Sequence, residues 1–130
     1  MSDQFQMVKN YISELGFDIS KEVKEEEVVI INDESKGIKN LIVDCEDTIL
    51  IVEQFILKLE RDEKEIYRRL LQINRNLVHG AFVLDDEGKT VIFRDTLQLQ
   101  SLDLNELEAT INSLSLALVE NANELIDFSK

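Results

Sequence analysis

The single histidine and the single cysteine are the first residues to consider for chemistry. His79 is the only histidine in 130 residues, so a zinc site with two histidines is impossible. It stands beside Gly80 where a helical pattern stops, and we expect it to interact with the helix C-terminal dipole rather than to act as a general base. Cys45 lies between Asp44 and Glu46, whose negative charges disfavour a thiolate. We predict a packed or partly exposed, inert thiol and no catalytic residue.

Three other motifs resemble ligand sites, but turns explain them better. Gly88-Lys89-Thr90 copies the tail of a phosphate-binding loop, yet Val83 occupies the position of that motif's first glycine and a strand follows. Two acidic clusters, Asp44-Glu46-Asp47 and Asp85-Asp86-Glu87, lack the alternating ligand spacing of a calcium loop. Acid-rich turns between strands are ordinary. The sequence therefore predicts no metal and no cofactor, and an enzyme that uses a carboxylate remains only a third alternative.

Composition favours one folded domain over residues 1–130. Hydrophobic residues make up 44% of the chain, Pro is absent and there are four Gly, so no linker divides it. The start of the chain lacks the pattern of a secretory signal, and we expect a cytoplasmic location.

With 27 Asp and Glu against 14 Lys and Arg, the net charge is −13. Such a charge disfavours nucleic acid and membrane as partners, and it either attracts a basic partner or only keeps the protein soluble.

Hydrophobic spacing predicts the elements of the first half. Residues 3–15 form an amphipathic helix, and strands are expected over 28–31, 38–44 and 48–57. The third of these is apolar on both faces from Ile49 to Val52, so we expect a central strand covered above and below.

The second half continues with a helix over 62–78 and a hairpin of strands 81–84 and 90–99. A last helix starts at Asp103 with a capping-box-like pattern and has one leucine-rich face. The predicted order is α-β-β-β-α-β-β-α, and short turns between strands imply a mainly antiparallel α+β fold flanked by helices.

The last helix also carries a possible binding surface. No Lys or Arg occurs from Asp95 through Ser129. An acidic row lies away from the leucines, and Leu116 stands beside it; the candidate partner-binding residues are Glu106, Leu116, Glu120, Glu124 and Asp127. Three of these acids are near the helix C-terminus, where the dipole disfavours anions. A solvated face and a docking surface for a cationic partner both remain open.

Several stretches of the second half resemble the YbjN-like proteins, which are close in fold to the bacterial type III secretion chaperones and include many "Tir chaperone-like" proteins. The resemblance covers residues 66–118 and is carried by segments 70–74, 78–85, 97–99 and 104–108. It implies an α/β sandwich that commonly forms homodimers and, in the secretion chaperones, a small acidic protein without ATPase activity that wraps an extended client segment around its surface.

The leading hypothesis is therefore a non-enzymatic, dimeric, chaperone-like domain that holds an extended or basic segment of a partner protein through sheet edges or grooves. The alternative is a small YbjN-like regulatory domain that binds one folded partner and holds no client.

Overall fold

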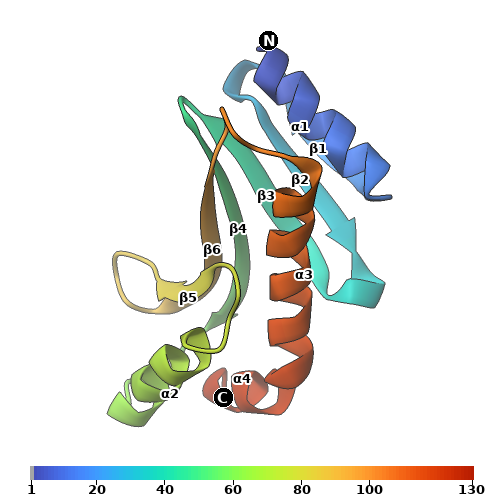
Figure 1. The fold of residues 1–130 in the computed structure, drawn as a ribbon. Coiled ribbons are helices and arrows are strands. Elements are labelled where there is room, and N and C mark those ends of the chain that lie inside the picture. The colour runs from blue at the N-terminus through green and yellow to red at the C-terminus, as the bar shows by residue number, and fades with distance from the viewer. Residues whose placement is uncertain (1) are drawn as a thin grey trace.

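The computed structural model describes residues 2–130 and shows one sheet packed against helices (Figure 1). The chain begins with α1 (Asp3–Glu14), β1 (Asp18–Val23), β2 (Val28–Asp33), β3 (Ile38–Glu46) and β4 (Ile49–Lys58), with 3-10 turns at Lys24–Glu26 and Glu34–Lys36. It continues with α2 (Lys64–Asn74), β5 (Ala81–Leu84), β6 (Thr90–Gln98), α3 (Leu104–Glu120) and α4 (Ala122–Phe128). The predicted α+β class is confirmed.

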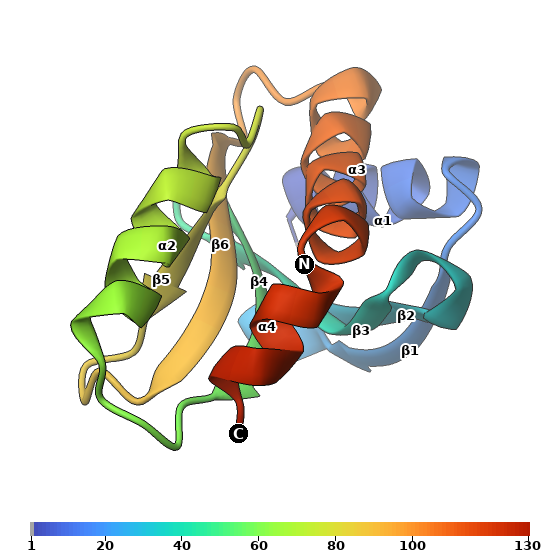
Figure 2. The same cartoon turned by 90° about the horizontal axis from the view of Figure 1, so that it is seen from below.

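The six strands form one antiparallel sheet in the order β1-β2-β3-β4-β6-β5. Helices α1 and α3 lie on the same side of this sheet (Figure 2). Strand β4 is central, as predicted, and buries Leu50 and Val52 beneath the helices. The expectation that both of its faces are covered is wrong for the single chain, because Ile49 and Ile51 are only half-buried and Phe55 is 62% exposed.

Strand β1 is absent from the predicted order. Its residues are mostly polar and exposed, and only Ile19 and Val23 are apolar, so no alternation signals a strand. It forms at an edge of the sheet through pairing with β2. The turn between them places Glu27 in the left-handed region, with φ 55°, where a glycine would have marked the turn in the sequence.

The second helix is shorter than predicted, and this changes the place of His79. Helix α2 buries Ile66, Leu70 and Ile73, as expected, but ends at Asn74. The following segment leads to Gly80, which has φ 74° and packs so closely on the ring of Phe93 that a Cβ would lie 2.3 Å from it. The prediction that His79 interacts with the end of this helix is therefore wrong.

The C-terminal helix is divided in two. Its start is as predicted, because the side chain of Asp103 accepts a hydrogen bond of 2.8 Å from the backbone N–H of Glu106. Asn121 interrupts the helical backbone, and its side-chain amide donates to the carbonyl of Ala117 at 2.9 Å. Four of the five residues predicted on the buried face are buried, and the fifth, Leu118, is half-buried. The four buried residues are Leu107, Ile111, Leu114 and Leu125.

Candidate protein-binding surface

The thiol of Cys45 is buried and has a raised pKa. Its side chain is 7% exposed in the core, and burial, together with the charges of Glu27 and Asp44, raises its pKa to about 12. A thiol with such a pKa has almost no thiolate to act as a nucleophile or a metal ligand. The expected packing of this thiol is confirmed, and its inertness stays a prediction.

The acid-rich turns close hairpins. The carboxylate of Asp85 accepts hydrogen bonds from the backbone N–H groups of Lys89 and Thr90, at 2.9 and 3.1 Å, and these bonds lower its pKa. This carboxylate therefore holds the β5–β6 turn, and the segment that copied a phosphate loop is the end of this turn, with Thr90 as the first residue of β6. Within residues 2–130, no three His, Cys, Asp or Glu side chains are grouped so that they could hold a metal ion.

His79 belongs to a polar cluster that joins three elements. The hydroxyl of Ser113 on α3 donates to the carbonyl of His79 at 2.7 Å and accepts from its N–H at 3.3 Å. The ring Nδ1 lies 4.0 Å from the carboxylate of Asp95 on β6, and that carboxylate accepts a hydrogen bond of 2.8 Å from Thr110. This cluster fixes the segment between α2 and β5 against α3.

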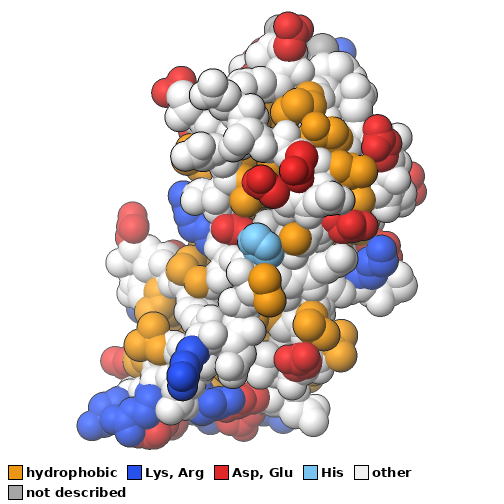
Figure 3. Space-filling model, in the orientation of Figure 1, with side chains coloured by type: hydrophobic (Ala, Val, Ile, Leu, Met, Phe, Trp, Pro, Cys, Tyr) orange, Lys and Arg blue, Asp and Glu red, His pale blue; other side chains and the backbone are white. Residues whose placement is uncertain are grey.

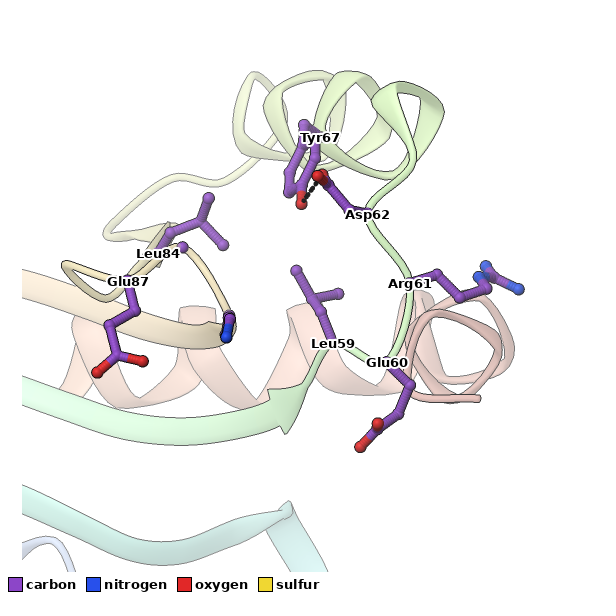
Figure 4. Close-up of a pocket in the computed structure, with 9 residues that line it drawn as sticks. Leu59, Glu60, Arg61, Asp62, Tyr67, Leu84 and Glu87 are labelled. Carbon is purple, nitrogen blue, oxygen red and sulfur yellow. Dashed lines mark hydrogen bonds between the residues drawn. The ribbon is translucent and has the colours of Figure 1, made fainter.

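A cleft of about 490 Å³ lies between the β4–α2 connection and the β5–β6 turn. Figure 4 shows Leu59, Tyr67 and Leu84 pointing toward its centre, whereas Glu60 and Arg61 point away. The Tyr67 hydroxyl donates to Asp62 at 2.7 Å, and this hydrogen bond raises the pKa of Tyr67.

The candidate residues on the C-terminal helices fall into two groups. Glu124 forms a bidentate ion pair with Arg69 of α2, in which Nε and Nη2 of the guanidinium donate to the two carboxylate oxygens at 2.6 and 2.9 Å. This pairing lowers the pKa of Glu124. Asp127 lies 3.4 Å from Arg61. These two acids therefore join α4 to the region of α2 rather than standing free.

Of the remaining candidates, Leu116 and Glu120 are exposed along α3, and Glu106 is half-buried near the start of the same helix. Leu116 is 56% exposed, as predicted. It lines a groove of about 230 Å³, which we call the α3 groove, between residues 76–79 and α3. Its lining residues are Asn76, Leu77, Val78, His79, Ala109, Asn112, Ser113, Leu116, Ala117 and Glu120. Sequence reasoning missed Val78, which is 84% exposed, because it was assigned to a longer α2.

The two edges of the sheet differ. At the β5 edge, the side-chain amide of Asn74 accepts from the backbone N–H of Phe82 at 2.8 Å and donates to its carbonyl at 3.0 Å. These are bonds that an added strand would form, so this edge is blocked at Phe82. At the other edge, β1 pairs only with β2, and residues 18–21 are exposed. Unpaired edge groups of this kind can pair with an added strand.

The sequence of residues 1–130 matches the family model CesT_Tir_1, of the type III secretion chaperones. The chain belongs to this family. The resemblance noted for residues 66–118 thus extends over the whole sequence. No curated protein matches it.

Three solved structures are similar over nearly their full length. YbjN, a putative transcription regulator from E. coli, is 12% identical with a TM-score of 0.69, over 92% of this chain and 91% of that chain. An uncharacterized protein from Methanothermobacter thermautotrophicus is 14% identical with a TM-score of 0.70, over 98% and 99%. A chain of the heterodimeric ExoU–SpcU complex, from the type III secretion system of Pseudomonas aeruginosa, is 14% identical with a TM-score of 0.69, over 95% and 98%. At these identities the likeness shows the fold.

Among the described residues, no helix has both the length and the apolar composition needed to span a membrane.

Proposed function

We propose that this chain is a non-enzymatic, chaperone-like protein-binding domain that works as a cytoplasmic homodimer and holds an extended or basic segment of a partner protein. Membership of the secretion-chaperone family supports the class. One of the similar structures is a chain from a heterodimeric complex, which supports a protein as the partner.

The free edge of β1 is the observation that carries the proposal. An extended segment that adds to β1 gains backbone hydrogen bonds whatever its sequence, and alternate side chains of the added strand supply specificity. The same segment is disfavoured at β5, where the Asn74 amide occupies the N–H and carbonyl of Phe82. Client binding is therefore directed to one side of the molecule, next to α1.

Hydrogen exchange on a purified complex tests this proposal. The tagged chain is used to isolate a partner from native lysate, mass spectrometry identifies it, and limited proteolysis defines the bound segment. Binding should slow amide exchange in residues 18–23 and leave β5 unchanged. The bound segment should be protease-sensitive when free. A complex in which exchange of β1 is unaffected would contradict strand addition.

The regulatory alternative predicts a different complex. A YbjN-like domain that binds a folded partner should leave that partner protease-resistant before and after binding. It should also protect a compact patch on each protein and no added strand. The similarity in fold to YbjN, a putative transcription regulator, is the observation that favours this alternative. The same proteolysis and exchange data separate the two functions.

Exposed aliphatic side chains near the β5 edge support the dimer. Leu71 of α2 is 71% exposed and Leu84 of β5 is 40% exposed, and a two-fold contact would cover both. Light scattering should give about twice the 15.0 kDa of one chain. Leu71→Glu should reduce the mass to that of one chain, whereas Val119→Glu, at a side chain 73% exposed on α3, should not. A wild-type mass of one chain at micromolar concentration would exclude the dimer.

A further inference from the structure

One side of α3 carries a glutamate near each end and two apolar residues between them, with the polar Asn112 and Ser113 alongside. Glu106, Ala109, Leu116 and Glu120 recur at spacings that place them along one side of the helix, beside its buried face. Glu120 lies fourteen positions after Glu106, which corresponds to about 21 Å at the rise of an α-helix. The apolar centre of this row forms one wall of the α3 groove.

The opposite wall of the groove is held in place before any ligand binds. Both backbone groups of His79 are bonded to Ser113, and Gly80 fixes the next turn against the ring of Phe93. Val78 nevertheless remains 84% exposed, so its side chain is available at the rim. A preformed site requires little ordering when a partner binds, which favours affinity.

Charge selects the kind of partner that fits. The lining of the α3 groove contains Glu120 and no Lys or Arg. Within residues 2–130, Glu106 and Glu120 form no ion pair, in contrast to Glu124 and Asp127. Figure 3 shows acidic and hydrophobic side chains around the histidine on this face, with basic side chains on both flanks and a larger basic cluster at the lower edge, over α2. The carboxylates of Glu106 and Glu120 are therefore available to cations of a partner.

We propose that the α3 groove seats an aliphatic side chain of a basic partner segment, whose Lys or Arg side chains on either side reach Glu106 and Glu120. This inference rests on the proposed function and assigns it a second contact surface, apart from the β1 edge. At about 230 Å³ the groove is smaller than a typical small-molecule pocket and suits the anchoring side chain of a peptide. The apolar anchor supplies affinity, and the acids raise the association rate.

Three fluorescein-labelled synthetic peptides of about twelve residues test the proposal on the full chain. The first has a central leucine pair flanked by lysines, the second replaces each lysine by glutamate, and the third replaces each leucine by serine. Fluorescence anisotropy should show the first peptide binding at least about tenfold more tightly than the other two. Equal binding of the lysine and glutamate peptides, or no binding of the first, would overturn the proposal.

Matched variants locate the binding site. Leu116→Glu should weaken binding about tenfold, whereas Ile126→Glu, at a side chain 55% exposed on α4, should not. Glu120→Gln should slow association and flatten its salt dependence, and Glu108→Gln, on another side of α3, should leave both unchanged. An unchanged affinity in Leu116→Glu would overturn the groove as the site. If the groove proposal fails in this way but β1 is still protected from amide exchange in the partner complex, the proposed function is not contradicted.

Discussion

Replacement of Leu114 by alanine is the sharpest test of how α3 packs on the sheet. Leu114 has no exposed surface and lies on the buried face of α3 with Leu107 and Ile111. Truncation removes three carbon atoms from the centre of the core and leaves a cavity that the surrounding strands cannot fully close. Such a change costs about 2–5 kcal/mol of folding free energy.

The expected shift in melting temperature follows from the size of the chain. An unfolding entropy of about 2.1 cal/mol/K per residue gives about 0.27 kcal/mol/K for this domain. The variant should therefore melt about 7–18 °C below the wild type. Circular dichroism during heating measures this shift. Urea titration should show a lower midpoint with an unchanged slope, because the surface exposed on unfolding hardly changes.

Leu116→Ala is the control, because it makes the same chemical change two residues further along the same helix. Its side chain is 56% exposed, so the free energy of unfolding should change by no more than about 0.5 kcal/mol, or about 2 °C. If the two variants melt at the same temperature, the orientation of α3 described here is refuted.

Four further outcomes are expected. Gly80→Ala should lower the melting temperature strongly, because a Cβ meets an aromatic ring at 2.3 Å and φ is 74°, and circular dichroism will measure the loss. Asn74→Ala should speed amide exchange at Phe82 and promote aggregation, followed by light scattering, since the β5 edge becomes free. Cys45 should resist iodoacetamide at pH 8 in the folded protein and react after denaturation, as a pKa of about 12 implies. The lowered pKa of Glu124 means that its ion pair stabilises the fold above the ordinary value of 4.5 and is lost as pH falls through the lower, folded-state value. Glu124→Gln should flatten this acid dependence in urea titrations, by a small amount because the pair is partly exposed.

Much of the fold could be predicted from local spacing. The buried rows of α1, α2 and α3, the N-cap at Asp103 and the β5–β6 hairpin all follow from periodicity and turn residues. Strand β1 could not be predicted, because an exposed edge strand needs no apolar face and gains its hydrogen bonds from β2, ten or so residues later. The break at Asn121 was also hidden, since leucines continue on both sides of it.

The candidate binding surface was predicted only in part. Leu116 and Glu120 were selected from the sequence and do line one groove. Glu124 and Asp127 looked equivalent to them, but their partners, Arg69 and Arg61, lie more than 50 residues earlier in the chain. Helical periodicity carries no information about contacts at that separation, which depend on where α2 rests against α4.

The unequal edges of the sheet set a limit on self-assembly. In the language of polymer chemistry, a subunit with two reactive ends is a link in a growing chain, and a subunit with one reactive end is a terminator. The amide of Asn74 makes this chain a terminator, because β5 offers no N–H and carbonyl pair at Phe82 while β1 does. Two copies joined through β1 would consume both open edges, and a third would have no strand to join. Strand pairing alone therefore stops at two copies and cannot extend a sheet from subunit to subunit.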